Sequence, residues 1–244
     1  MILREIKPFK LLKDIYALGL GVWLPKRKVF VVADLHLGYE EYLNKQGILI
    51  PRQQFKLTNE LLEKMLATIK PETIIINGDL KHEFGKISQQ EWNETLKILD
   101  ILSLHSKKIV LIKGNHDTIL GPIARKRNLS VKDLYSIGDI CITHGHKIWK
   151  DKNFLKAKTI IIANEHPAIS IKEGIKSELY KCFLVGKWRL KNLVVMPSFL
   201  PIIEGTDVRK EKVLSPYLHQ PLQNFNVFIV GDKIYNFGRL RNIK

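Results

Sequence analysis

The stretch Val29-Phe-Val-Val-Ala-Asp-Leu-His36 joins a continuous apolar run to an Asp-x-His motif, and this arrangement recurs along the chain. The later motifs, each after a similar run, are Gly78-Asp79 after residues 73–77, Gly114-Asn-His-Asp117 after 108–112, His144-Gly-His146 after 140–143, and His166 after 159–163. Short β-branched runs bounded by breakers are typical of strands covered on both faces. The motifs are therefore expected at strand ends.

Segments with apolar residues at helical spacing lie between the first three of these runs. Pro51 is expected to open a helix with apolar residues on one face, and Ser88 with Glu91 forms a capping-box pattern before a second helix. Alternating strands and helices predict parallel strands, whereas the second half is β-rich and contains a hairpin around Gly231-Asp232. We expect an α/β (α+β) fold with two mixed β-sheets packed face to face as a sandwich flanked by helices, in a single domain spanning residues 1–244.

The bulk composition indicates a folded protein outside the membrane. Hydrophobic residues make up 45% of the 244 residues, which argues against disorder. No apolar run reaches the roughly 18 residues that span a bilayer, and residues 1–7 lack the apolar core of a signal peptide, so a cytoplasmic location is expected. Cys141 and Cys182 lie in strand-like surroundings and are expected to be buried free thiols.

The charge balance favours a polyanionic partner. Lys and Arg number 40 against 24 Asp and Glu, a net charge of +16, which points chiefly to nucleic acid. Lysine-rich surfaces also occur in proteins from hot environments, where glutamates accompany the lysines, and basic clusters can be ordinary solvated faces. The cluster Arg125-Lys126-Arg127 follows the third motif, so Arg125 and Arg127 are candidate substrate-binding residues.

The motif residues are suited to binding divalent metals. Six of the eight histidines lie in or beside the motifs, and carboxylate, amide and neutral imidazole groups are common metal ligands. Asp34 and His36, two residues apart, can share one ion, and Asp79 can bridge two ions. Asn115 can ligate while His116 faces the substrate. A metal-bridging hydroxide would attack phosphorus, with His116 as proton donor or transition-state stabiliser.

Together the motifs resemble the calcineurin-like metallophosphoesterase superfamily, and within it the archaeal phosphoesterases related to Mre11/SbcD nucleases and to DNA-ligase-associated phosphoesterases. The resemblance covers about residues 30–167 and extends to Met196-Pro-Ser-Phe-Leu-Pro201 and Gly205-Thr-Asp207. It implies the following roles: Asp34 and His36 bind the first metal, Asp79 bridges, Asn115 and His144 bind the second metal, His116 is catalytic, Asp117 orients it, and His82 lies near the phosphate. His82 could equally be a loop residue without a role.

One position departs from the family pattern. The family ends this region with Gly-His-x-His, whereas this chain has Ala163-Asn-Glu-His166. His166 matches a ligand of the first metal, and Asn164 stands where a second-metal histidine is expected. An amide oxygen favours manganese or magnesium over zinc or iron, so we expect two divalent ions, foremost Mn²⁺, with Mg²⁺, Zn²⁺ and Fe²⁺ as alternatives. His146 or Glu165 could assist the second ion.

These observations favour a metal-dependent phosphodiesterase acting on nucleic acid, as a nuclease or an end-processing enzyme. The alternatives are a phosphodiesterase or phosphatase of small, for example cyclic, nucleotides and, from another class, a non-catalytic nucleic-acid-binding module. His116 argues against the binding module, because such a module needs no catalytic histidine. The resemblance also suggests a DNA-processing partner such as a helicase or ligase. Trp149 and Trp188 are the tryptophans that could stack on bases.

Overall fold

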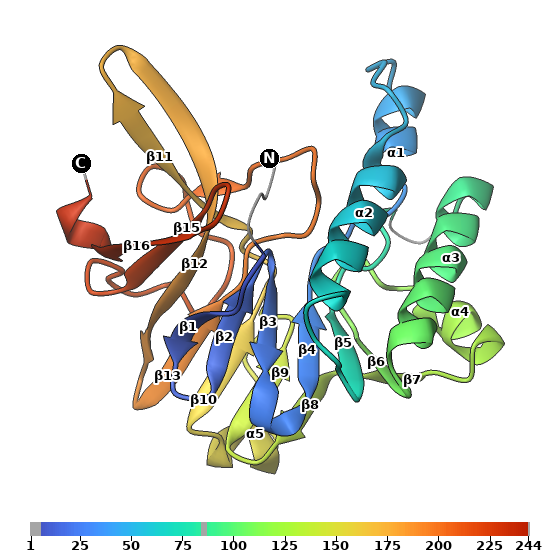
Figure 1. Ribbon diagram of the computed structural model, residues 1–244, viewed down its shortest axis with the longest axis horizontal. Helices are drawn as coiled ribbons and strands as arrows, with labels where there is room; N and C mark the ends of the chain where they lie inside the picture. The colour runs from blue at the N-terminus through green and yellow to red at the C-terminus, as the bar shows by residue number, and fades with distance from the viewer. Residues whose placement is uncertain (1–5, 84–86, 244) are drawn as a thin grey trace.

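The first half of the chain forms one mixed sheet (Figure 1). The computed structural model describes residues 6–83 and 87–243. Within these residues the sheet has seven strands in chain order, β1 to β7, antiparallel up to β4 and parallel from β4 onward. The strands are β1 Phe9–Leu12, β2 Ile15–Leu18, β3 Gly21–Leu24, β4 Val29–Val32, β5 Thr73–Asn77, β6 Lys108–Ile112 and β7 Ser130–Lys132.

A second mixed sheet contains the remaining strands, in the described order β14-β11-β12-β13-β10-β9-β8, with the β15–β16 hairpin paired to β12. β9, β10 and β13 run parallel to one another. The strands are β8 Leu134–Ile137, β9 Ile140–Thr143, β10 Thr159–Ile162, β11 Pro167–Glu173, β12 Lys176–Trp188, β13 Lys191–Val195, β14 Thr206–Asp207, β15 Asn226–Val230 and β16 Ile234–Arg239. The expected pair of mixed sheets is confirmed.

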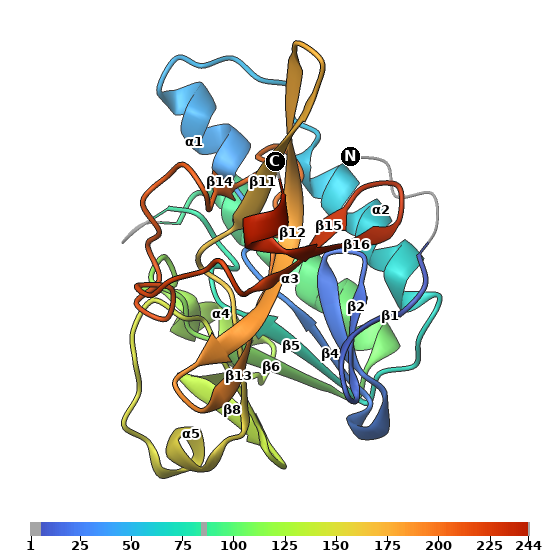
Figure 2. The same ribbon diagram turned by 90° about the vertical axis from the view of Figure 1, so that its left-hand side faces the viewer.

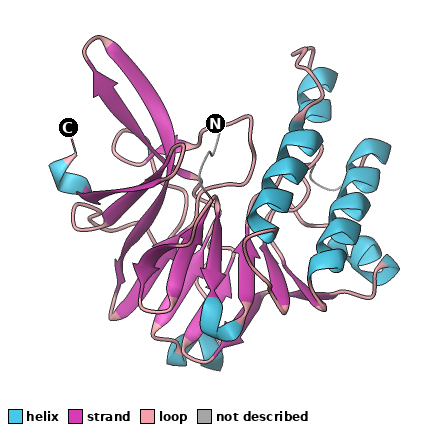
Figure 3. Ribbon diagram, in the orientation of Figure 1, coloured by secondary structure: helices cyan, strands magenta, loops and turns pink. Residues whose placement is uncertain are grey.

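Helices flank the sheets (Figure 3). They are α1 Tyr39–Lys45, α2 Gln54–Leu66, α3 Gln89–His105, α4 Leu120–Lys126 and α5 Lys152–Lys156, with short 3-10 turns at Pro25–Arg27 and Leu240–Asn242. The first four follow strands of the first sheet and lie on one side of it, whereas α5 belongs to the second sheet (Figures 1 and 2).

The start of α2 differs from the prediction. The helix begins at Gln54 and not at Pro51, because Glu40 of α1 accepts hydrogen bonds from the backbone N of Gln53 at 2.8 Å and of Gln54 at 2.6 Å. A buried carboxylate from a neighbouring helix thus supplies the acceptor that an N-terminal side chain usually provides.

The capping box before α3 forms only in part. The hydroxyl of Ser88 accepts a hydrogen bond from the backbone N of Glu91 at 3.0 Å, as predicted. The carboxylate of Glu91, however, accepts from the backbone N of His82 and Glu83 at 2.7 and 2.9 Å, where the capping box would have it reach back to Ser88. Glu91 therefore fixes the segment that carries His82.

The second sheet is apolar on both faces. Ile161 and Val194 face the core shared with the first sheet, whereas their neighbours Ile160 and Leu193 face a second cluster on the opposite side. That cluster is covered by Phe154 of α5 and by the segment before β15. Double coverage explains the uninterrupted apolar runs of these strands. The free thiols Cys141 and Cys182 are buried here, as expected, and burial raises the pKa of both.

The sequence pattern predicted one hairpin and missed another. The β15–β16 hairpin around Gly231-Asp232 is confirmed. The β11–β12 hairpin, which projects from the body in Figures 1 and 2, was not predicted, and neither was the meander from β1 to β3.

No helix among residues 6–83 and 87–243 is long and apolar enough to cross a membrane. Residues 1–5 of the expected leaderless N-terminus lie outside the described residues, and the single-domain assignment stays a prediction.

Candidate metal centre

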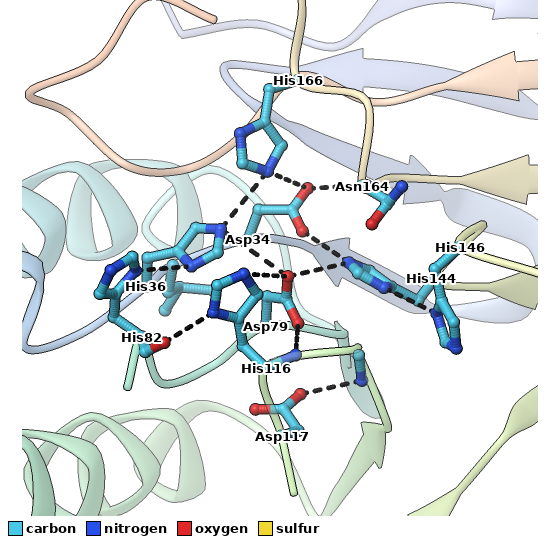
Figure 4. Close-up of polar contacts among 12 residues, drawn as sticks. Asp34, His36, Asp79, His82, His116, Asp117, His144, His146, Asn164 and His166 are labelled. Carbon is cyan, nitrogen blue, oxygen red and sulfur yellow. Dashed lines mark hydrogen bonds and ion pairs between the residues drawn. The ribbon is translucent and has the colours of Figure 1, made fainter. Parts of the chain in front are cut away.

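The motif residues converge on one site, as Figure 4 shows. Asp34, His36, Asp79, His116 and Asp117 follow strands of the first sheet, and His144, Asn164 and His166 follow strands of the second. Among the described residues, three overlapping sets place their ligand atoms within 4.8 Å of one another: Asp34–His36–His166, Asp34–Asp79–His144 and His36–His82–His116. The site thus lies where strand ends of both sheets meet, as expected for α/β sheets.

Asp34 links the two halves of the site. Its Oδ1 lies 2.9 Å from Nε2 of His144, and its Oδ2 lies 3.4 Å from Nε2 of His166. Oδ2 also accepts a hydrogen bond of 3.1 Å from the backbone N of Asn164. The side chain has no solvent exposure. Burial opposes ionisation, but the His166 and His144 rings hold the pKa of Asp34 well below its usual range.

Asp79 occupies the centre of the site. Its Oδ1 accepts a hydrogen bond of 2.9 Å from the backbone N of His116. Its Oδ2 lies 3.6, 3.8 and 3.9 Å from Nε2 of His144, His36 and His116, respectively. Burial raises the pKa of Asp79; His144 acts against this rise and the charge of Asp34 adds to it. Asp79 thus lies where a carboxylate could bridge two ions.

His36 faces two sides. Its Nε2 lies 3.4 Å from Nε2 of His166, and its Nδ1 lies 3.4 Å from Nδ1 of His82. Burial lowers the pKa of His36 well below its usual value, and the neighbouring charge of His166 lowers it further. The neutral ring that results is the form in which histidine binds metals.

His116 is held by a backbone carbonyl. Its Nδ1 lies 2.6 Å from the carbonyl O of His82, so Nδ1 donates a hydrogen bond and Nε2 points toward Asp79. The sequence assigned this orienting contact to Asp117. In the structure Asp117 is fully buried and its Oδ2 accepts from the backbone N of Gly114 at 3.0 Å. Asp117 therefore shapes the loop that carries His116.

His82 stacks on His116, with ring centroids 5.3 Å apart. Burial lowers the pKa of His82 to about 4, and the charge of His116 contributes. The structure thus brings His82 into the histidine cluster. A loop residue without a role would not need to lie there. His146 contacts His144 through their Nδ1 atoms at 3.1 Å, which is the position of a residue that orients a ligand.

The two asparagines differ in placement. The amide of Asn164 lies beside the Asp34–His144 pair in Figure 4, and the residue is half-buried. Asn115 is exposed, and among the described contacts none joins its side chain to the cluster. Its role as a second-metal ligand stays a prediction.

The backbone at the site is strained. Asp34, His36, Asp79, Asn164 and His166 all have φ between 45° and 66°, in the left-handed region that non-glycine residues rarely adopt. The motif glycines make room for this arrangement. A Cβ at Gly78 would collide with the His144 ring, and one at Gly114 would collide with Oδ1 of Asp79. Surrounding contacts must hold such a conformation, so the site is preorganised.

The basic cluster at the end of α4 contacts the neighbouring helix α3. Arg127 pairs with both carboxylate oxygens of Asp100 on α3 at 2.5 and 2.7 Å, and Lys126 lies over the Trp92 ring. Arg125 is exposed at the end of α4. The substrate-binding role of Arg125 and Arg127 stays a prediction, and for Arg127 the carboxylate of the adjacent helix already pairs with its guanidinium. Trp188 is buried against Phe154 and Tyr217, and not available for stacking on bases.

Sequence analysis missed the residues that hold the motif loops. Nε2 of Gln54 donates to the carbonyl oxygens of Leu35 and His36 at 3.0 and 2.8 Å. Oε2 of Glu165 accepts from the backbone N of Leu214 and Ser215, both at 2.8 Å. A glutamine one turn after Pro51 carries no motif signal, since its partners lie 18 and 19 residues away.

The donor set fits divalent ions. Two buried carboxylates, five imidazoles and one amide lie around a shared centre, and burial together with the charge of Asp34 raises the pKa of Asp79, an effect that added positive charge would oppose. Carboxylate and imidazole ligands suit manganese, zinc, iron and, with amides, magnesium.

Comparisons with known proteins identify the family and the fold. The family described as calcineurin-like phosphoesterase matches residues 27–193. The structure is similar to nuclease MPE of Pseudomonas putida, with a TM-score of 0.69 at 16% identity, covering 96% of this chain and 100% of that chain. Weaker likenesses include Vps29 from Entamoeba histolytica (18% identity, TM-score 0.37, 85% and 90% covered) and the Escherichia coli phosphoesterase Yfce (10%, 0.38, 84% and 88%). A search of curated proteins found no match.

Proposed function

This chain belongs to the calcineurin-like phosphoesterase family and is a metal-dependent phosphoesterase, and from this premise we propose that it hydrolyses phosphodiester bonds in nucleic acid. One observation carries the proposal. Oδ2 of Asp79 lies within 3.9 Å of the rings of His36, His116 and His144, which come from both sheets. A bridging carboxylate and a histidine directed at the same centre are what dinuclear phosphoester hydrolysis needs.

Two ions would be held unequally. Asp34, His36 and His166 would hold one ion with Asp79, and His144 would hold the other with Asp79 and the amides of Asn115 and Asn164. Bound there, divalent ions supply an activated water and neutralise charge on the phosphoryl group. The amide ligands support manganese as the working ion.

His116 would deliver the proton to the leaving oxygen. Its Nδ1 is committed to the His82 carbonyl, which leaves Nε2 as the atom that can face the substrate. Burial lowers the pKa of His116, which favours the neutral ring. A phosphodiester beside the ring carries a negative charge that favours protonation of Nε2, which can then donate.

The nucleic-acid part of the proposal rests on charge. A net charge of +16 attracts polyanions and raises their rate of encounter. The same proposal includes a DNA-processing partner such as a helicase or ligase, for which the resemblance noted from the sequence is the support. It also includes the cytoplasmic location expected from the sequence.

Digestion of end-labelled DNA with added Mn²⁺, resolved by product length, tests the proposal. The wild type should cut, and His116→Ala should lower the rate by about 10²–10⁴-fold while retaining metal. His105→Ala is the matched control, because His105 pairs with Glu63 on the outer helices. Cleavage by His116→Ala at the wild-type rate would overturn the assignment of the proton donor. Hydrolysis of small diesters without any cleavage of DNA would overturn the nucleic-acid substrate.

A further inference from the structure

A pocket of 440 Å³ lies beside the metal centre, within the size range of small-ligand sites. Apolar side chains from α1, the α1–α2 segment, α2 and the segment after β13 make most of its wall. Its lining includes Tyr39, Glu40, Gln53, Leu57, Ile202 and Ile203. Nothing in the proposed chemistry at the ions uses this pocket.

The metal loop supports one wall of the pocket. The backbone N of Tyr39 donates to the carbonyl O of His36 at 3.1 Å, and the Tyr39 ring lies 4.6 Å from the His82 ring. Tyr39 thus contacts the histidine cluster through its ring and is also a lining residue of the pocket. The pocket and the reacting phosphate would therefore be neighbours.

The opposite wall is tied to the same loop. The backbone N of Phe199 donates to the carbonyl O of Ala33 at 2.9 Å, immediately before Asp34. Ile202 and Ile203 follow three and four residues later and are half-buried. Both walls are therefore anchored to residues next to the metal ligands, which fixes the pocket relative to them.

The lining chemistry suits a flat aromatic heterocycle. An aromatic ring and aliphatic side chains offer apolar surface, and Leu57 remains 39% exposed. Glu40 is 2% exposed, and its Oε1 accepts hydrogen bonds from the backbone N of Gln53 and Gln54, which hold the carboxylate against the start of α2. Stacking of a base on an aromatic side chain contributes about 1–3 kcal/mol.

We propose that this pocket binds the base of a nucleotide next to the scissile phosphodiester, an inference that rests on the proposed function. A base can enter the pocket only when it is unpaired. The substrate is therefore single-stranded nucleic acid or a frayed end, and paired ends are poor substrates until they open.

Three chromogenic diesters test the proposal with Mn²⁺: the 5′- and 3′-(4-nitrophenyl phosphate) esters of thymidine, and methyl 4-nitrophenyl phosphate, which has no base. At least one thymidine ester should exceed the methyl ester in kcat/KM by about 5- to 150-fold, the range that corresponds to the stacking energy above. Leu57→Gln should remove most of this advantage through KM and leave the methyl ester unchanged. Tyr39→Leu should also lower the thymidine-to-methyl ratio, and Tyr39→Phe should preserve it.

Leu104→Gln is the matched control, because Leu104 is 83% exposed on α3 and does not line the pocket. Equal kcat/KM for all three esters, or equal effects of Leu57→Gln and Leu104→Gln, would overturn the base pocket and leave the phosphodiesterase intact. A change in oligomeric state of Leu57→Gln, with the ester ratio unchanged, would assign the patch to an interface instead. Absence of turnover of all three esters would overturn the proposed function and the pocket together.

Discussion

Two loops of the site have the same backbone design and different chemistry. Asp34-Leu-His36 follows β4 in the first sheet, and Asn164-Glu-His166 follows β10 in the second. The first and third residues of both loops are left-handed, with φ of 54° and 45° in one and 66° and 51° in the other. Nε2 atoms of the two histidines lie 3.4 Å apart. The loops therefore face each other as near-equivalent halves.

The difference lies in charge. The first loop contributes a fully buried carboxylate, whereas the second contributes a neutral, half-buried amide whose backbone N donates to Asp34. A carboxylate attracts a divalent ion far more strongly than an amide does in a buried site. We expect the two ions to bind with unequal affinity, the tighter one on the side of His36 and His166.

The largest effect is expected from making the first loop like the second. Asp34→Asn keeps the shape and removes the charge that His144 and His166 surround. Metal binding should fall, and turnover should drop by more than about 100-fold, since even residues that only orient ligands cost 10- to 100-fold. Metal content after dialysis and the rate of diester hydrolysis measure this. Normal metal content in the variant would show that Asp34 is not a ligand.

The loops also differ in the side-chain hydrogen bonds that hold them in place. Gln54→Met leaves the carbonyls of Leu35 and His36 without their buried donor, so the free energy of unfolding should fall by about 1–3 kcal/mol. Glu165→Gln keeps an acceptor for Leu214 and Ser215 and should cost less. Urea denaturation in chelator measures both, with the exposed Gln89→Met as control. A greater loss for Glu165→Gln would reverse this comparison.

Making the second loop like the first should tighten the weaker ion. Asn164→Asp adds a carboxylate beside Asp34 and His144, and the second Mn²⁺ should bind about tenfold more tightly, or about 1.4 kcal/mol. Calorimetric titration of metal-free protein measures this, with the exposed Asn93→Asp as a charge-matched control. An unchanged second affinity would show that position 164 lies outside the coordination sphere.

The last effect builds up gradually with pH and concerns support of the first loop. Lys181 is buried and its Nζ donates to Ser198 and to the carbonyl O of Leu200, on either side of Phe199. Burial lowers the pKa of Lys181 to about 7, so between pH 7 and about 10 the unfolded chain binds more protons than the folded chain. Lys181 should therefore make stability rise with pH in this window, by at most about 1.4 kcal/mol per pH unit.

The difference between wild type and Lys181→Met isolates this dependence from other titrating groups. Urea denaturation at intervals from pH 7 to 10 should show a smaller rise of stability with pH in the variant. Parallel curves for the two proteins would show that Lys181 titrates normally.

Sequence could predict the parts of the molecule that depend on local patterns. The β-branched runs before Asp34 and Asp79 are confirmed as β4 and β5, because burial on both faces leaves a continuous apolar signature. The Ser88 cap is confirmed because its signal, Ser88 followed by Glu91, lies within four residues.

The rest depends on contacts between distant segments. The carboxylate of Glu40 moves the start of α2 from Pro51 to Gln54, and no local pattern contains that contact. Arg127 pairs with Asp100, which lies 27 residues earlier in the chain, and no local pattern contains that contact. His116 is oriented by a backbone carbonyl, a partner that side-chain motifs cannot reveal.

Titration of metal-free protein with Mn²⁺, following bound ions per chain and cleavage of a labelled single strand in the same samples, tests the central claim most directly. The account predicts a tight first ion with little turnover and cleavage that rises with occupancy of a second, weaker ion. Full cleavage with one ion bound, or cleavage in excess chelator, would contradict a dinuclear phosphodiesterase with unequal sites.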